Sequence, residues 1–148
     1  MPKWTPRVTV AAIVNNRDKF LLVKEKPEGQ IVYNQPAGHL EDNESLVDAV
    51  KREVFEETGV TFNPTALVGI YRWRHPVKQF TYLRFAFTGD VASTMLKPND
   101  NDIIEALWLN QSEVEQLIDQ HRSPQVLAGI RDYQKGIRYN LNILQDIF

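Results

Sequence analysis

The stretch GHLEDNESLVDAVKREVFEETGV, residues 38–60, carries a dense run of acidic side chains. Seven acids lie between Glu41 and Glu57, where only Lys51 and Arg52 are basic. The 148-residue chain has 17 basic and 19 acidic residues, a net charge of −2. Without the seven acids and two bases of this stretch, 15 bases face 12 acids, so the remainder is mildly basic. The negative charge is therefore a local feature.

The same stretch predicts an amphipathic helix from Glu44 to about Thr58. Asn43 is a suitable N-cap, and Gly59 is suited to the left-handed residue that ends a helix. Apolar residues recur at the spacing of one helix face, which should pack on a sheet: Leu46, Val47, Val50 and Val54.

At about 100° per residue, Glu53 and Glu57 fall within this apolar face or at its edge, and Glu56 lies beside them. Their like charges repel, partial burial penalises each ionised carboxylate, and the helix dipole disfavours anions in its last turns. A bound divalent cation removes all three penalties. Because the chain has no cysteine and no suitably spaced histidine, oxygen ligands favour Mg²⁺ or Mn²⁺ over zinc.

The alternative is a solvated helix face with ion pairs. Asp48 and Arg52 are four residues apart, as are Arg52 and Glu56, and oppositely charged side chains at that spacing attract on a helix surface. Phe55 lies on the polar side of the predicted helix, and the pattern gives it no role.

Length and composition indicate one globular domain over residues 1–148, with 43% apolar and 24% charged residues. The near-neutral balance disfavours a binder of duplex nucleic acid. The N-terminal apolar run of about seven residues is too short for a secretory signal or a membrane span. We expect a cytoplasmic enzyme or binding protein, monomeric or a small homo-oligomer.

Strands are predicted where β-branched and large apolar residues cluster between turn residues. The expected strands cover residues 8–14, 19–24, 31–33, 66–74, 80–88 and 103–109, and two further helices cover 112–120 and 124–135. The elements do not alternate regularly, so an α/β fold is expected, with a mixed sheet covered by helices on both faces.

The pattern Gly38, Glu44, Arg52-Glu53-Val54, Glu56-Glu57 and Gly59-Val60 matches the Nudix box at every specified position. The chain therefore resembles the Nudix hydrolases. This resemblance implies an α/β/α sandwich with a mixed central sheet. It also implies Mg²⁺-dependent cleavage of a nucleoside diphosphate linked to another group, with Mn²⁺ as a substitute cation.

By this resemblance, Glu53 and Glu57 are the principal metal ligands, and Glu56 is either a third ligand or the general base. Gly38 lets the backbone approach the metal or phosphate, where a Cβ would crowd it. Glu44 and Gly59 have structural roles. Arg52 supports catalysis by keeping the carboxylates ionised and oriented.

Four candidates lie outside the box. The resemblance also implies that Glu105 is a second candidate base or an extra metal ligand, with an exposed strand-edge glutamate as the alternative. Arg84 is a candidate phosphate clamp that should point outward, opposite Leu83 and Phe85 on its strand; a surface ion pair is the alternative. Trp73 and Tyr33 are candidates for stacking on a base, although aromatic residues in strands commonly only pack.

Other segments resemble the NudJ-type nucleoside tri- and diphosphate phosphatases within this family. They are NQPAGHLE (34–41), Leu83-Arg84-Phe85, Arg122-Ser123-Pro124 and IRDYQKGIRY (130–139). This resemblance implies a small nucleotide or pyrophosphate substrate, including hydroxymethylpyrimidine pyrophosphate. The alternatives are an oxidised dNTP, ADP-ribose or a dinucleoside polyphosphate. A non-catalytic nucleotide-sensing module is a further alternative.

Overall fold

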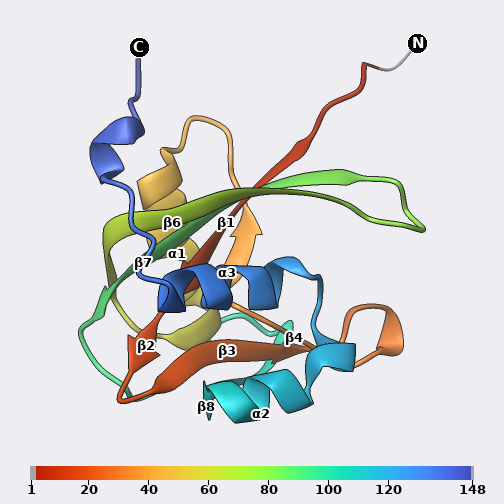
Figure 1. Ribbon diagram of the computed structural model, residues 1–148. Coiled ribbons are helices and arrows are strands. Elements are labelled where there is room, and N and C mark those ends of the chain that lie inside the picture. Colours follow the sequence, from red (N-terminus) through yellow and green to blue (C-terminus); the bar gives the residue numbers. More distant parts are fainter. Residues whose placement is uncertain (1–2, 148) are drawn as a thin grey trace.

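The computed structural model describes residues 3–147, which form two four-stranded sheets and three α-helices (Figure 1). The first sheet has the strand order β5-β1-β7-β6. These strands are β5 (Ala37–His39), β1 (Arg7–Ile13), β7 (Thr81–Val91) and β6 (Phe62–Arg74). The β1–β7 pair is parallel, whereas β1–β5 and β6–β7 are antiparallel. The predicted mixed sheet is therefore confirmed.

The second sheet is antiparallel throughout. Its strands are β2 (Asn15–Asn16), β3 (Lys19–Glu25), β4 (Val32–Asn34) and β8 (Ile103–Asn110). The sequence pattern did not separate it from the first sheet. The tight turn after β2 places Arg17 and Asp18 at φ 50° and 64°. The chain reverses there, and β3 then pairs with β8 and β4 instead of adding to the first sheet.

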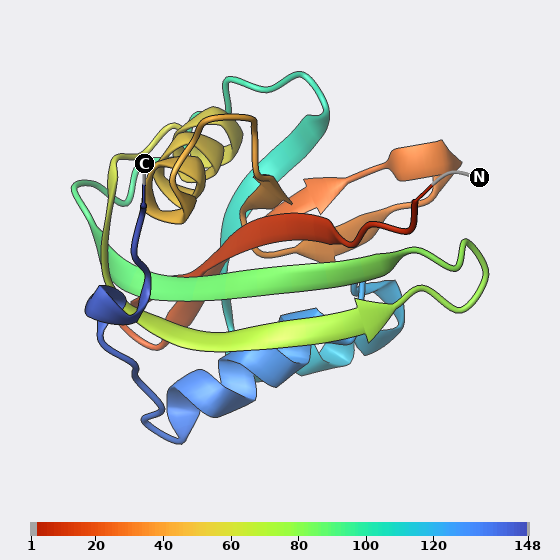
Figure 2. The same ribbon diagram turned by 90° about the horizontal axis from the view of Figure 1, so that it is seen from above.

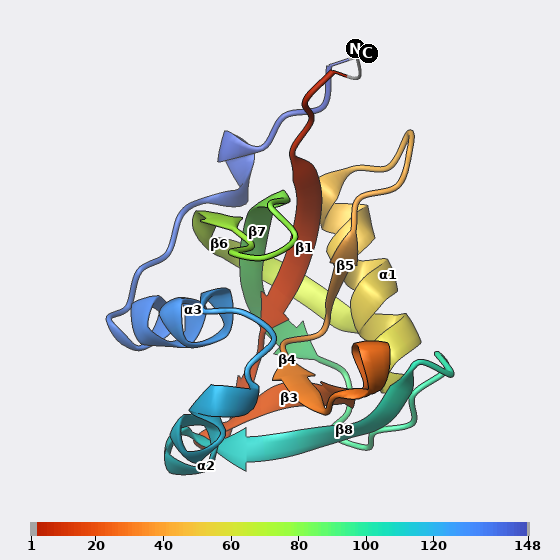
Figure 3. The same cartoon turned by 90° about the vertical axis from the view of Figure 1, so that its right-hand side faces the viewer.

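Helices cover both faces of the first sheet, which gives an α/β/α arrangement (Figure 3). α1 (Leu46–Thr58) lies on one face and α3 (Gln125–Gln134) on the other. Along β1, Val10 and Ala12 join the core cluster that contains α1, whereas Ile13 joins the cluster that contains Ile130 of α3. The two-residue period of the strand thus builds both cores.

The helix α1 begins two residues later than predicted. Asn43 lies in the left-handed region at φ 61°, so the chain is still turning there. Ser45 is the N-cap instead, and its side-chain oxygen accepts a hydrogen bond from the backbone N–H of Asp48 at 3.0 Å. Both residues are good caps by type, and only the path of the loop decides between them.

The other two helices also differ from their predicted bounds. The predicted helix over 112–120 is a short α2 (Gln111–Gln116) followed by the 3₁₀ turn η2 (Ile118–Gln120). Asn110 caps α2 through a capping box. Pro124 is the N-cap of α3. The two remaining 3₁₀ turns are η1 (Pro27–Gly29) and η3 (Leu141–Ile143).

The strand β6 starts at Phe62, four residues before the predicted start, and forms a long hairpin with β7 (Figure 2). The pairing of the two strands is irregular near Pro64 and Gly69. Such irregularities interrupt the alternation of side chains by which a strand is predicted from sequence. Across residues 3–147, no helix has both the length and the apolar character to cross a membrane.

The C-terminus of α1 is closed by Gly59 and the segment 97–100. Gly59 has φ 78°, as predicted for a left-handed stop, and its N–H bonds to the carbonyl of Phe55. The backbone N–H groups of Asn99 and Asp100 both donate to the carbonyl of Glu56 at 2.9 Å. These bonds satisfy carbonyls that a helix end leaves without an intrahelical partner.

Replacing Gly59 tests how tightly this end is packed. A Cβ on Gly59 would overlap the carbonyl oxygen of Lys97, whereas Gly136, at φ 80°, has open space around its Cβ position. Gly136→Ala should lose roughly 1–2 kcal/mol from the left-handed backbone alone. Gly59→Ala should lose at least about 1 kcal/mol more because the loop must also move. Urea unfolding curves measure both, and equal losses would contradict the close approach.

Candidate active site

Gly38 lies directly over the carboxylate of Glu53. On β5 it pairs with Val10 of β1, and a Cβ at position 38 would overlap the Glu53 carboxylate carbon and both of its oxygens. Only glycine leaves that carboxylate room beside the strand. The atoms that approach Gly38 in this structure are those of Glu53, and the predicted approach of a metal or phosphate to Gly38 stays a prediction.

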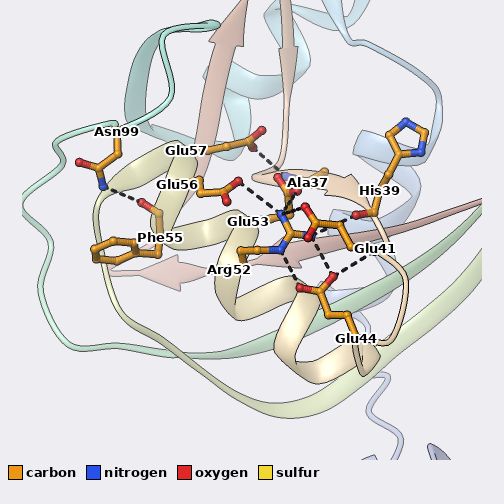
Figure 4. A network of polar contacts seen from close by, with 10 residues as sticks. All are labelled: Ala37, His39, Glu41, Glu44, Arg52, Glu53, Phe55, Glu56, Glu57 and Asn99. Carbon is orange, nitrogen blue, oxygen red and sulfur yellow. Dashed lines mark hydrogen bonds and ion pairs between the residues drawn. The ribbon is translucent and has the colours of Figure 1, made fainter.

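Arg52 is the centre of the polar network around the start of α1 (Figure 4). Its guanidinium holds Glu44 at two positions, with Nε donating at 2.6 Å and Nη2 at 2.9 Å. Its Nη1 donates to Glu53 at 2.6 Å and to Glu56 at 3.3 Å. Its Nη2 also donates to the carbonyl of His39 at 3.1 Å. One side chain therefore joins the loop before α1 to two glutamates of the box.

These bonds set the charge of the network. Hydrogen bonding to Arg52 lowers the pKa of Glu44, and the same contacts, that with Glu44 first, raise the pKa of Arg52. Both groups are thus held in their charged forms. The predicted pair of Arg52 with Glu56 forms, whereas Asp48 makes no ion pair within residues 3–147.

Glu53 and Glu57 are buried, as the helical wheel predicts, at 8% and 5% exposure. Burial raises the pKa of Glu57 to about 9, partly offset by the backbone N–H of Ala37, which donates to its Oε1 at 2.9 Å. Burial likewise raises the pKa of Glu53 to about 7 against the lowering effect of Arg52. Glu56 is more open, with 44% of its side chain exposed. The three glutamates are therefore not equivalent.

The donor set fits a hard divalent cation. Two buried carboxylates lie on one helix face, and Glu57 has no cationic partner among the described residues. Carboxylate oxygens are the ligands that Mg²⁺ and Mn²⁺ prefer. In residues 3–147 no three acidic or histidine side chains already gather into a cation site. Arg52 donates hydrogen bonds to Glu53 and Glu56 instead. A bound cation would therefore share these two carboxylates with Arg52.

Asp100 is a further acidic residue at this site that the sequence did not single out. The segment that carries it is bonded to the carbonyl of Glu56, and Asn99 also donates to the carbonyl of Phe55 at 3.1 Å (Figure 4). The charge of Asp100 contributes to the raised pKa of both Glu53 and Glu57. Nothing in the local sequence KPNDND marks this position, because the contact arises only when the loop closes over α1.

Glu105 lies elsewhere. It pairs with Lys24 across β3 and β8, and directly paired residues share one face of a sheet. Lys24 lies on the same face of β3 as Leu22, which belongs to the core cluster that contains Ile130 of α3. Leu21, on the opposite face, belongs to the core cluster that contains α1 residues. Glu105 is exposed on the side away from α1. The structure does not bring it to the box glutamates.

Arg84 is buried, and the expectation of an outward position was wrong. It does lie opposite Leu83 and Phe85, but that face of β7 is covered, and Arg84 is only 5% exposed. Its Nη1 donates to Gln35 Oε1 and its Nη2 to Asn34 Oδ1, both at 2.9 Å. A residue on the second face of a strand is surface-exposed only if no other layer covers it.

Tyr33 and Trp73 lie on strands of different sheets. Tyr33 pairs with Lys24, on the same face as Glu105, and its carbonyl accepts from the N–H of Arg122. Trp73 stacks on Tyr82 with ring centroids 5.9 Å apart and an interplanar angle of 23°. The packing alternative therefore describes Trp73 in this structure. Its role, and that of Tyr33, toward a base stay predictions.

Comparison with known proteins agrees with this architecture. Residues 5–128 match the NUDIX domain family. Phosphatase NudJ of Escherichia coli is 41% identical over 144 residues, covering 97% of this chain and 93% of that protein. A NUDIX hydrolase from Nitrosomonas europaea superposes with a TM-score of 0.92 at 47% identity, covering 97% and 98% of the two chains.

A more distant structure shares the fold. The NUDIX domain of Shewanella oneidensis NrtR, solved in complex with ADP ribose, superposes with a TM-score of 0.72 at 15% identity. That comparison covers 89% of this chain and 88% of the other.

The burial of Glu57 predicts an opposite effect of its removal with and without metal. Between pH 4.5 and about 9 the unfolded chain loses this proton while the folded chain keeps it, so stability falls as the pH rises. At pH 8 in EDTA, Glu57→Gln should therefore melt several degrees higher than the wild type. Added Mg²⁺ should raise the melting temperature of the wild type but not of the variant.

Differential scanning fluorimetry measures these shifts, with the exposed Glu105→Gln as the matched control. An unchanged or lower melting temperature of Glu57→Gln in EDTA would contradict the cost of burying this carboxylate. A full response of the variant to Mg²⁺ would remove Glu57 from the cation site.

Proposed function

Because this chain belongs to the Nudix family, we propose that it is a Mg²⁺-dependent hydrolase of nucleoside tri- and diphosphates. Its family and its NudJ relative make it a hydrolase of acid anhydrides in phosphorus-containing compounds. The metal, the substrates and the residue roles are the proposal.

One observation carries the proposal: two carboxylates are buried on one face of α1, beside a glycine and an arginine that position them. The carboxylate of Glu53 is confined between Gly38 and Arg52. Glu57 is held by the N–H of Ala37 and has a raised pKa because it is buried. Such an arrangement destabilises the metal-free fold, and a function that uses a cation explains why it is there.

Glu53 and Glu57 would hold the cation, and Glu56 would be either a third ligand or the general base. When bound, Mg²⁺ neutralises phosphate charge and lowers the pKa of a coordinated water. Arg52 keeps Glu53 and Glu56 oriented through its Nη1, and Glu44 fixes Arg52 in turn. Most of the rate acceleration then comes from positioning and electrostatics, as in other phosphoryl transfers.

The proton acceptor is one of two carboxylates beside the C-terminal half of α1. Glu56 is the more accessible glutamate of the box, and only its Oε2 is bonded to Arg52. Asp100 is the second candidate, because the loop over α1 brings it near Glu53 and Glu57. We therefore propose Asp100 for the role of second candidate base, which the sequence analysis gave to Glu105. Glu105 lies on the face of the second sheet that is turned away from α1.

Substrate recognition is proposed to rest on phosphates more than on the base. Strong selection of one base needs several buried polar groups paired with its edge. The aromatic candidates Tyr33 and Trp73 lie apart, and stacking on a ring does not distinguish bases. This supports a permissive phosphatase, in keeping with the name of the E. coli relative. Hydroxymethylpyrimidine pyrophosphate falls within the same chemistry; an oxidised dNTP, ADP-ribose or a dinucleoside polyphosphate would need added selectivity.

The products decide between these alternatives. With Mg²⁺, the purified chain should release orthophosphate from both ATP and ADP, with little difference among bases and large loss of activity on AMP. In H₂¹⁸O the label should appear in the released orthophosphate, which places attack at the terminal phosphorus. Pyrophosphate as sole product, with preference for one oxidised base, would favour a nucleotide-pool enzyme. Absence of turnover on every nucleotide would favour a sensing module.

Asp100 and Glu105 form a matched pair for the proton acceptor. If Asp100 and not Glu56 accepts the proton, Asp100→Asn should lower kcat by about tenfold or more, since a positioned general base contributes roughly 10²–10⁴-fold. Glu105→Gln should stay within about twofold of the wild type, because its side chain is exposed on the other face. Steady-state kinetics on ATP at saturating Mg²⁺ measures both. The reverse ranking would restore Glu105 and remove Asp100.

A further inference from the structure

Arg122, on the segment between η2 and α3, differs from the buried Arg84 in its exposure. Almost half of the Arg122 side chain is exposed, at 48%, and its Nη1 contacts Glu25 Oε2 at 2.5 Å. Glu25 ends β3 and is itself buried, with an exposed fraction of 8%. Nη2 and Nε of Arg122 make no hydrogen bond within residues 3–147. The guanidinium thus keeps donors available beside its ion pair.

Both arginines are fixed to the same three residues of the chain, Tyr33 to Gln35. Arg84 donates from its guanidinium to Asn34 and Gln35. Arg122 donates from its backbone N–H to the carbonyl of Tyr33 at 2.8 Å. The segment that carries Arg122 runs beside β4 (Figure 3) and forms a bridge there between His121 and Tyr33. Two positive groups are therefore held close together at this loop.

The loop is also continuous with the cation site. Ala37, two residues after Gln35, donates its N–H to Glu57. Glu25 lies near enough to Glu57 for its charge to contribute to the raised pKa of that residue. Glu25 thus contacts Arg122 and also lies near Glu57, a carboxylate of the candidate cation site.

Arg84 and Arg122 lie near enough for their charges to interact. Burial, and next the charge of Arg122, lower the pKa of Arg84 to about 10, while Glu25 and Glu57 act in the other direction. Arg122 also lowers the pKa of His39, after burial and the charge of Arg7. In addition, Nε of Arg84 is a buried donor that has no hydrogen-bond partner among residues 3–147. An anion beside Arg122 would also be stabilised by the nearby charge of Arg84.

We propose that Arg122 binds a phosphate group of the substrate, and that Glu25 is the counter-ion it leaves when that phosphate arrives. A phosphate carries up to two negative charges and several acceptor oxygens, so it competes well with one carboxylate for a guanidinium. Arg84 is a positioning residue, because its Nη atoms are buried and engaged by Asn34 and Gln35. The phosphate-clamp role predicted for Arg84 passes to Arg122.

This inference rests on the proposed function, since it names the residue that recognises the phosphate chain at that site. A purely structural Arg122–Glu25 ion pair makes a different prediction. Breaking it from either side would then cost stability, and neither change would tighten the binding of an anion. With competition, removal of the carboxylate charge frees Arg122 and strengthens anion binding, whereas removal of the arginine weakens it.

The test is direct binding of methylenediphosphonate, a pyrophosphate analogue whose P–C–P bridge is not hydrolysed, to the full chain in Mg²⁺ by isothermal titration calorimetry. Arg122→Ala should weaken the affinity about tenfold or more, and Arg122→Lys should recover part of it. Glu25→Gln should tighten binding about three- to tenfold. The exposed Arg131→Ala, which removes a charge from the outer surface of α3, should leave the affinity unchanged.

Weaker or unchanged binding to Glu25→Gln overturns the proposal, as does an affinity of Arg122→Ala within twofold of the wild type. Lack of binding by the wild type overturns it too. Circular dichroism and melting curves verify folding, and Arg122→Gln replaces Arg122→Ala if the alanine variant does not fold. Because the readout needs no turnover, failure of the chain to hydrolyse nucleotides would reject the proposed function without deciding this result.

Discussion

An ionised carboxylate is strongly solvated in water, and moving it into a protein interior raises its pKa unless a cation or several donors replace that solvation. The helix α1 buries two such groups, Glu53 and Glu57, on the face that packs against the sheet. Several neighbouring residues accommodate these two buried carboxylates. Gly38 leaves space for one carboxylate, Ala37 donates an N–H to the other, and Arg52 supplies a positive charge at the edge.

Arg52 contacts both the loop before α1 and the glutamates of the candidate site. It ties Glu44 and the carbonyl of His39 to the helix, and so fixes the loop that leads from β5 into α1. The same guanidinium contacts Glu53 and Glu56. The position of the strand and the orientation of the glutamates are thus set by one network, because planar guanidinium donors fix their acceptors in direction as well as distance.

The site draws on segments that are far apart in the chain because two sheets and the loops between them meet near α1. β5 brings Gly38, the segment 97–100 closes over the last turn of the helix, and β3 ends with Glu25. This architecture is that of the Nudix family. Within it, the charged groups divide into carboxylates along α1 and arginines next to the β4–β5 loop.

The sequence by itself determined α1, its buried acidic residues and the family. The apolar spacing predicted the helix and its buried face, Gly59 predicted its end, and the Gly38–Val60 pattern predicted the family. These signals are local, because each of them can be recognised within one continuous segment of the chain. The predicted burial of Glu53 and Glu57 followed from the same periodicity and is what the structure shows.

Only the tertiary structure decided what lies around that helix. The division into two sheets, the choice of Ser45 over Asn43 as the cap and the covered position of Arg84 depend on which layers pack together. Asp100 reaches the site through backbone bonds to Glu56, and Glu105 misses it because strand pairing sets its face. Contacts between distant segments are fixed by packing and strand register, and no periodicity within one segment encodes them.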